Sequence, residues 1–250
     1  MRLYSGTGNV FVLADGRFEE LPRDPVALLA RQRSEAPEGA RADGLIEVSF
    51  ELERPRIVFR NLDGSRPEAC GNGLRCAAFH VADTGGPSAF ELDTDAGPRR
   101  ACVTEDGRVE VSMGSATLEE PRSIDLPSGS LELVPVRVGN PHAVLFVADP
   151  AEVPLDELGP SIERHAAFPD GTNVEFAALS DQGLNVRIWE RGVGETRACG
   201  SGAVALAAVA HRLGHVTLPV DVRSPGGTLR VRAEGAELFV AGAVQRLPFE

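Results

Sequence analysis

The sequence predicts an α/β fold of the α+β kind, with two pseudo-symmetric lobes, each a sheet wrapped around a central buried helix, and an active site between them. Two near-copies of one phrase indicate the duplication. Residues 70–73 read Cys-Gly-Asn-Gly and residues 199–202 read Cys-Gly-Ser-Gly, and each phrase opens an Ala-rich apolar stretch. Asn61 and Glu190 repeat at the same offset as the two cysteines. The simplest interpretation is therefore that the chain is a duplication of one unit.

Segments rich in β-branched and apolar residues predict a similar series of strands in each half. In the first half they are residues 11–14, 45–50, 56–60, 89–92 and 109–113. In the second half they are residues 143–147, 174–178, 185–189, 219–222 and 237–241. A short amphipathic helix is expected from Pro25 to about Arg33, because Asp24 suits the N-cap and proline suits the first helical position.

Each cysteine phrase leads into a segment that predicts a buried helix. Residues 203–209 are apolar on every side, and residues 74–81 nearly so, interrupted by Arg75 and His80. A helix without a polar face must be buried. Strands before and after each helix therefore indicate a sheet wrapped around it. The histidines at 80, 165, 211 and 215 are expected at the surface or at helix ends.

A stretch rich in Pro, Ser and Gly at residues 119–130 predicts the boundary between the lobes. The N-terminal lobe is then residues 1–118 and the C-terminal lobe residues 119–242. The final residues 243–250 are candidates for completing the first lobe.

Composition restricts the class of protein. The chain has 250 residues, 42% of them hydrophobic, and a net charge of −12, which argues against a nucleic-acid partner. The N-terminus lacks the apolar core of a signal peptide, and no apolar run is long enough to span a membrane. We therefore expect a cytoplasmic protein without a membrane partner, and its four cysteines as thiols.

Several cofactors are disfavoured by the sequence. All 25 basic residues are Arg, so the Lys that holds pyridoxal phosphate or that completes a P-loop is missing. A dinucleotide fingerprint is also missing. The cysteines lack Cys-x-x-Cys spacing, and His211 and His215 have no accompanying cysteine pair or Glu, so no metal site is expected. We predict a protein that uses no cofactor.

Cys70 and Cys199 suit acid–base chemistry, because each precedes a helix whose free N–H groups and dipole favour an anion. This position predicts a thiol pKa below the ordinary value. The following Gly-x-Gly lets backbone N–H groups bind a carboxylate. Two such helix starts facing each other would hold one α-carboxylate and place a sulfur on each face of the α-carbon. One thiolate would remove the α-proton while the opposite thiol delivers another, which inverts the centre.

Other roles for the cysteines stay open at this point. Free cysteines are usually buried and inert, which is the expected role of Cys76 and Cys102. For Cys70 and Cys199 the alternative is a metal-binding or redox dithiol, although the local spacing of redox dithiols is missing.

The two phrases, extended to residues 69–76 and 190–203, closely resemble the two signatures of the diaminopimelate epimerases. Gly8-Asn9, residues 139–142 and Thr172-Asn173-Val174 fit the same family, so the resemblance covers essentially the whole chain. It implies a cofactor-independent epimerase that converts LL- to meso-diaminopimelate for lysine and peptidoglycan synthesis. It also implies the two-lobed architecture and leaves a homodimer open.

The resemblance assigns roles residue by residue. Cys70 and Cys199 resemble the acid/base pair, and His142 and Glu190 resemble the polar residues beside the thiols. The implied substrate-binding residues are Asn9, Asn61, Gly71, Asn72, Asn140, Asn173, Glu190, Arg191, Gly200 and Ser201. Arg191 suits a second carboxylate, and amide or carboxylate oxygens suit a second ammonium. The Asn residues could equally serve turns.

The chain departs from the family pattern in three places. Val10 stands where the family usually has Asp, Gly44 where it has Gln or Gly, and Phe249 is the nearest aromatic to a C-terminal Tyr associated with dimer packing. Two rival functions remain: another cofactor-free racemase, for proline or a single-headed amino acid, and a non-catalytic amino-acid-binding protein. The second would not need both cysteines.

Overall fold

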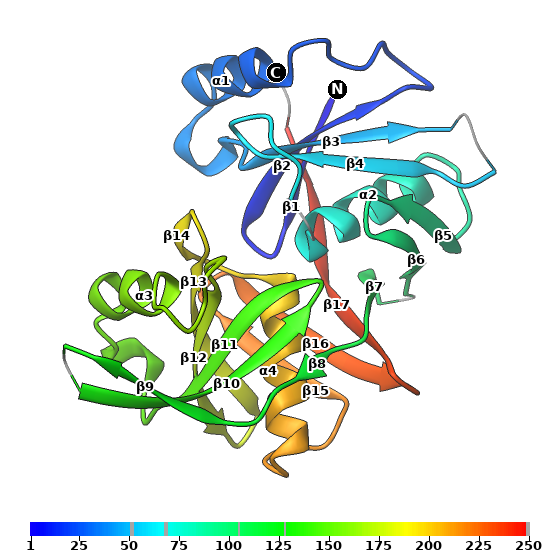
Figure 1. Cartoon of the computed structure of the whole chain (residues 1–250). Coiled ribbons are helices and arrows are strands. Elements are labelled where there is room, and N and C mark those ends of the chain that lie inside the picture. The colour runs from blue at the N-terminus through cyan, green and yellow to red at the C-terminus, as the bar shows by residue number, and fades with distance from the viewer. Residues whose placement is uncertain (51–52, 68–69, 105, 128, 249–250) are drawn as a thin grey trace. The chain divides into compact units, whose positions relative to one another are not determined.

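The computed structural model describes residues 1–50, 53–67, 70–104, 106–127 and 129–248 (Figure 1). The chain divides into two compact units: unit 1 comprises Met1–Ser112 and Ala241–Glu250, and unit 2 comprises Met113–Val240. Phe249 and the final residue of the segment 243–250 lie outside the described residues. That the predicted lobes 1–118 and 119–242 are separate domains stays a prediction.

Unit 1 is a mixed sheet in which each strand pairs with the next along the chain, and the last strand of the protein joins its first. Its strands are β1 (Arg2–Gly6), β2 (Asn9–Asp15), β3 (Gly44–Ser49), β4 (Arg56–Arg60), β5 (Ala89–Thr94), β6 (Gly97–Val103), β7 (Arg108–Gly114) and the end of β17 (Glu237–Leu247). The pairs β2–β3 and β4–β5 are parallel and the other consecutive pairs are antiparallel. β17 pairs with β1 and also with β7, which closes the sheet.

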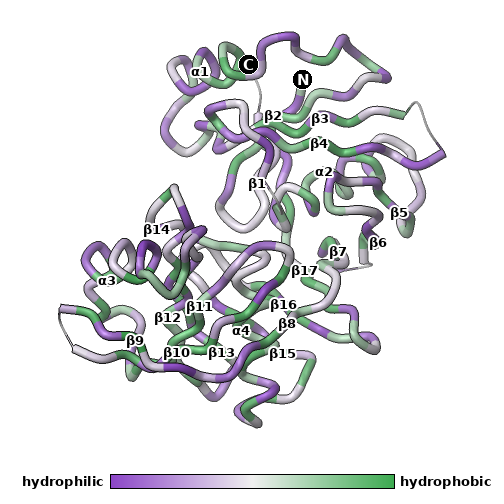
Figure 2. Tube along the Cα trace, in the orientation of Figure 1, coloured by the Kyte–Doolittle hydropathy of each residue, from purple (hydrophilic) through white to green (hydrophobic). Residues whose placement is uncertain are grey.

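The two parallel pairs of unit 1 are connected through its helices. α1 (Pro25–Glu35) lies between β2 and β3, followed by the 3-10 turn η1 (Glu38–Ala40), and α2 (Gly71–Asp83) lies between β4 and β5. α2 contacts β1, β2, β3, β4 and β6, so the sheet wraps around it as expected. Figure 2 shows hydrophobic residues along β2 and β3, which agrees with their almost continuous burial.

Unit 2 has the same arrangement of strands and helices. Its strands are β8 (Thr117–Leu118), β9 (Arg122–Leu126), β10 (Gly129–Val138), β11 (Asn140–Phe146), β12 (Asn173–Ser180), β13 (Gly183–Glu190), β14 (Gly194–Thr196), β15 (Val220–Ser224), β16 (Gly227–Glu234) and the start of β17. Here β11–β12 and β13–β15 are the parallel pairs. α3 (Leu155–Glu163), preceded by η2 (Pro150–Glu152), connects the first pair, and α4 (Gly200–Arg212) connects the second.

The duplication is therefore visible in the topology. In both units an antiparallel hairpin leads through a helix into a parallel neighbour, and the buried helix lies between the two strands of the second parallel pair, β4 and β5 in unit 1 and β13 and β15 in unit 2. α4 is buried from Gly200 to Ala210 and contacts β10, β11, β12, β15 and β16. The predicted α/β fold with two lobes, each a sheet around a central helix, is confirmed.

The structure adds two details to the expected local structure. The stretch 119–130 is not a simple linker, because β9 pairs with β10 in a hairpin from Leu126↔Gly129 to Arg122↔Leu133. The prolines and serines of this stretch hid the strands, because these residue types are typical of turns and loops. The first helix begins as expected, with Asp24 accepting a hydrogen bond from the Ala27 N–H at 3.0 Å, but it continues to Glu35.

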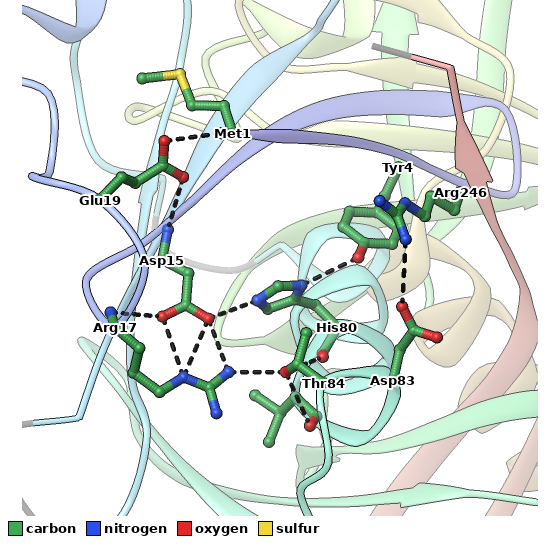
Figure 3. Close-up of polar contacts among 10 residues, drawn as sticks. Met1, Tyr4, Asp15, Arg17, Glu19, His80, Asp83, Thr84 and Arg246 are labelled. Atoms are coloured by element: carbon green, nitrogen blue, oxygen red, sulfur yellow. Dashed lines mark hydrogen bonds and ion pairs between the residues drawn. The ribbon is translucent and has the colours of Figure 1, made fainter.

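His80 lies in the last turn of α2, one of the two places expected for it, and it is fully buried. Its Nδ1 lies 3.0 Å from the Tyr4 hydroxyl and its Nε2 lies 2.7 Å from Oδ2 of Asp15 (Figure 3). Asp15 also accepts from the Arg17 guanidinium at 2.7 Å, and that guanidinium donates to Thr84 (Figure 3). The network fastens α2 to β1 and β2.

Candidate active site

In unit 1, the candidate site residues gather at the start of α2. Cys70 is the N-cap residue, with φ −144° and ψ 83°, and its carbonyl accepts the Leu74 N–H at 2.8 Å. Its side chain is neither exposed nor fully buried. Gly73 is required here, because a Cβ at this position would lie 2.9 Å from the Cys70 Sγ and 2.9 Å from the Phe59 ring. The thiol therefore lies directly against the first helical turn.

Asn72 and Asn9, both predicted from the sequence, contact each other. The Asn72 Nδ2 donates to Oδ1 of Asn9, and Asn72 Oδ1 accepts from Arg75 Nη2 at 2.9 Å. The two residues come from the first turn of α2 and the first residue of β2. Asn61 lies instead in an exposed turn, where its Nδ2 donates to the Ser65 Oγ at 3.0 Å. The contacts of Asn61 therefore agree with the alternative that it stabilises a turn.

The departures from the family pattern have local explanations. A Cβ on Gly44 would lie 2.7 Å from the carbonyl oxygen of Arg60 on the neighbouring strand, so a side chain has no room. Val10 is apolar, but its N–H donates to the Asp43 carboxylate at 2.9 Å. A carboxylate is therefore present at this turn although residue 10 does not supply it.

In unit 2, the candidate site residues gather at the start of α4. Cys199 is its N-cap residue, and its Sγ accepts the Gly202 N–H at 3.4 Å and lies 3.3 Å from the Ser201 Oγ. Burial, with the carboxylates of Glu190 and Glu175 nearby, raises the pKa of Cys199 well above its ordinary value. The sequence predicted a lowered pKa for this thiol, which is the opposite direction. It revealed the helix start, but it did not reveal the burial of Cys199 or the nearby Glu175.

Glu190 is partly buried and lies beside this thiol. Its Oε1 accepts from the Thr196 hydroxyl at 2.6 Å. Burial raises its pKa, against the opposing effects of the Thr196 bond, of His142 and of a hydrogen bond from Cys199. A carboxylate in hydrogen-bond reach of a thiol, with a pKa moved toward neutrality, can exchange a proton with it.

His142 and Asn140 lie beside each other in unit 2. Glu175, which was not predicted from the sequence, contacts His142. His142 Nδ1 is 2.7 Å from Oε1 of Glu175, and its Nε2 is 2.9 Å from Oδ1 of Asn140. His142 and Glu175 are fully buried. Glu175 is two residues after Asn173 on β12, hence on the same face of the strand, and an acidic residue in such an apolar strand was the signal for it.

Asn173 and Arg191 are also neighbours, but backbone groups occupy much of their bonding capacity. Asn173 Nδ2 donates to the carbonyl of Pro141 at 2.8 Å, and its Oδ1 accepts the Arg191 N–H at 2.9 Å. The Arg191 guanidinium donates to the carbonyl of Asp170 at 3.0 Å. Asn173 thus fixes the backbone at the point where β13 ends and Arg191 begins the next turn.

Each unit therefore presents a thiol at the start of a buried helix, with backbone N–H groups of Gly71 and Asn72 in unit 1 and of Gly200 and Ser201 in unit 2 at the same helix starts. Such a start can bind a carboxylate, and the thiol can exchange a proton. Within the described part of the chain, no group of three or more His, Cys, Asp or Glu has the geometry to hold a metal ion.

The sequence was compared with known proteins and matches a family of epimerases. The model of the family described as diaminopimelate epimerase matches residues 1–119 and 134–247. The chain belongs to the diaminopimelate epimerase family. The diaminopimelate epimerase of Synechococcus elongatus is 38% identical over 96% of this chain and 92% of its own length. That of Moorella thermoacetica is 41% identical over 90% of this chain and 88% of its own length.

Solved structures of more distant proteins share the fold. A PhzF-family phenazine biosynthesis protein from Enterococcus faecalis has a TM-score of 0.73 at 15% identity, over 99% of this chain and 96% of its own. A hydroxyproline epimerase from Agrobacterium vitis, with bound trans-4-hydroxy-L-proline, has a TM-score of 0.69 at 16% identity, over 99% and 90%. No helix in the described residues is long and apolar enough to cross a membrane.

Proposed function

We propose that this protein interconverts LL- and meso-diaminopimelate with Cys70 and Cys199 as its acid/base pair and without a cofactor. The observation that carries the proposal is the pair of cysteine-capped buried helices, one in each unit of a diaminopimelate epimerase family member. The α-carboxylate of the reacting centre would bind the N–H groups of the two helix starts, including those of Gly71, Asn72, Gly200 and Ser201.

The proton transfer follows from the surroundings of the thiols. Cys199 has a raised pKa and therefore starts as a thiol. In that state of the enzyme, Cys70 as thiolate removes the α-proton from one face and Cys199 delivers its proton to the other. The products are a thiol at Cys70, a thiolate at Cys199 and the inverted centre. Glu190, which reaches the Cys199 thiol, and His142, which affects the pKa of Glu190, return that sulfur to its starting form.

The distal amino-acid centre would be recognised by Arg191 for its carboxylate, with Glu190 and the amides of Asn9, Asn61, Asn140 and Asn173 toward its ammonium. A site built for a second charged centre rejects a substrate that lacks it, because its polar groups then stay unpaired. Homodimer formation, a cytoplasmic location, and a role in lysine and peptidoglycan precursor synthesis stay part of the same proposal.

The decisive experiment follows deuterium incorporation from D₂O into candidate amino acids by NMR. Unmodified enzyme should label and epimerise diaminopimelate, and Cys70→Ala and Cys199→Ala should each lose epimerisation by about 10²–10⁴-fold or more. The matched control is Cys102→Ala, in β6. Near-native epimerisation by either single variant would rule out the two-thiol mechanism.

The same assay distinguishes the rival substrate class. Arg191→Ala should lower kcat/KM for diaminopimelate far more than for any single-headed amino acid, because only diaminopimelate has a second, distal carboxylate for Arg191 to bind. Proline, hydroxyproline, lysine and ornithine should be poor substrates of the unmodified enzyme. Comparable turnover of one of them would instead make the protein a racemase of that amino acid.

A further inference from the structure

Arg75 is the largest fully buried side chain of the molecule as described, and the proposed reaction gives it no role. It lies on α2, where its Nη2 donates both to the Thr7 hydroxyl at 2.7 Å and to Asn72 Oδ1 at 2.9 Å. Thr7 is in the β1–β2 turn and has a φ of 52°, unusual for a residue with a Cβ. One buried cation thus joins this turn to the first turn of the helix that Cys70 caps.

The hydrogen bonds continue beyond Asn72 in one direction. Arg75 donates to Asn72 Oδ1, Asn72 Nδ2 donates to Asn9 Oδ1, and Asn9 Nδ2 donates to the Asp43 carboxylate at 3.4 Å. The chain starts on a group that can only donate and ends on a group that, when ionised, can only accept. Reversing either amide would place two donors or two acceptors face to face.

We propose that Arg75 is a positioning residue that fixes the amide orientations of Asn72 and Asn9, with Asp43 as the weaker anchor at the other end. This rests on the proposed function, in which both Asn residues face substrate. The orientation directs the Nδ2 groups away from Arg75 and toward the turn, and the Oδ1 of Asn9 has a second lone pair with which it can accept from the substrate ammonium. Burial lowers the pKa of Arg75 to about 10, against the effects of Cys76 and Cys70, so it stays charged at neutral pH.

The variants that best test the role of Arg75 are Arg75→Met and Arg75→Lys. Met removes the donor but fills similar space, and an apolar replacement of a buried charge need not unfold a protein. Because the contacts with Thr7 and Asn72 both use the single atom Nη2, a Lys ammonium can supply them. Lys loses the long donation of Nη1 to the Gly71 carbonyl, at 3.5 Å. The Nε that Lys lacks has no hydrogen-bond partner among the described residues, so its loss removes no bond.

Arg75→Met should raise KM for diaminopimelate by about 10–100-fold with kcat nearly unchanged, because the amides bind substrate and transition state alike. Arg75→Lys should keep most of the affinity. Arg31→Met, in an exposed ion pair with Glu35 at 3.0 Å, is the matched control and should keep the native KM. A folded Arg75→Met enzyme with native KM, or Arg75→Lys no better than Arg75→Met, would overturn the proposal.

Asp43→Ala is the second variant, at an exposed position where the fold should tolerate it. Since either anchor alone still favours one amide orientation, the double variant with Arg75→Met should lose more kcat/KM than the product of the two single losses. Purely multiplicative losses would contradict the directional chain. If Arg75→Met is poorly stable, Asp43→Ala alone still tests the proposal, because it removes the accepting end of the chain at an exposed position and should by itself raise KM for diaminopimelate.

A readout without substrate separates this proposal from the proposed function. The side-chain amide protons of Asn9 and Asn72, followed by ¹⁵N NMR, should exchange faster with water in Arg75→Met than in native protein or Arg75→Lys. Unchanged exchange would overturn the positioning role. Absence of diaminopimelate turnover by native enzyme would overturn only the proposed function, and the amide measurement would still decide the role of Arg75.

Discussion

Cys199 lies under two opposing influences. The helix start and the Gly202 N–H favour its thiolate, whereas burial and the carboxylates of Glu190 and Glu175 favour its thiol. Only 8% of the residue is exposed, so water screens the carboxylates poorly. The thiol form therefore prevails at neutral pH.

Replacing Glu190 by Gln should make Cys199 more acidic. Gln can still accept from the Thr196 hydroxyl, but it removes the negative charge that raises the pKa of the thiol most. Each unit by which that pKa falls gives about tenfold more thiolate. Alkylation of Cys199 at pH 8, followed by peptide mass spectrometry, should become faster. Glu195→Gln, which breaks the Arg187 ion pair of 2.9 Å, should leave the rate unchanged. A slower rate in Glu190→Gln would contradict the electrostatic account.

The sequence revealed the residues of the candidate site better than their surroundings. Motif spacing identified Cys70, Cys199 and Asn72, because each belongs to a short local phrase. Glu175, Asp43 and Thr7 were missed, because they reach the site through pairing of strands that are distant in the sequence. Burial, which decides the direction of the Cys199 pKa, is also a property of the whole fold.

At the scale of elements, α2 and α4 depend on glycine in their first turns. A Cβ on Gly202 would lie 2.6 Å from Oε1 of Glu175 and 3.3 Å from the Cys199 Cβ. The glycines are thus needed for packing, since the helix itself would prefer Ala. The strand elements were harder to predict than these helices: β9 and β10 lie in a Pro-containing stretch with only partial burial.

Gly202→Ala should destabilise the protein although Ala is the better helix former. The contact with Glu175 implies overpacking, which costs about 1–3 kcal/mol. Gly39→Ala is the control, because a Cβ there meets nothing within 4 Å, and it should change stability by no more than about 0.5 kcal/mol. Urea unfolding monitored by circular dichroism measures both. A neutral Gly202→Ala would show that Glu175 moves aside without cost.

The His80 network that fastens α2 makes stability depend on pH. Burial lowers the pKa of His80, against the effect of Asp15, so the unfolded chain binds a proton near pH 6.5 that the native protein resists. Burial opposes ionisation of Asp15, but bonds from Arg17 and His80 still hold its pKa below the ordinary value. Both groups therefore remove stability as pH falls, His80 below about 6.5 and Asp15 below about 4.

His80→Gln should flatten the first of these losses. Between pH 7 and pH 5, the free energy of unfolding should fall less in this variant than in native protein, at about 1.4 kcal/mol for each unit of pKa shift removed. His211→Gln, at an exposed position, should keep the native pH dependence. A parallel pH dependence in native protein and His80→Gln would assign the acid sensitivity to other groups.

At the scale of the whole molecule, the two units repeat one order of strands and helices, yet the chain does not finish one before it begins the other. β17 belongs to unit 2 up to Val240 and to unit 1 from Ala241 onward. Its last residues pair with β1 from Gly6↔Val244 to Leu3↔Leu247. The residues that close the sheet of unit 1 thus follow all of unit 2 along the chain.

This placement sets an order for folding during synthesis. Domains usually fold as the ribosome releases them, the N-terminal one first. Here the N-terminal unit waits with one side of β1 unpaired while all of unit 2 is translated, and such an edge is a template for pairing with a neighbouring chain. The nascent protein is therefore most exposed to aggregation before β17 leaves the ribosome. Unit 1, which is synthesised first, is completed after unit 2.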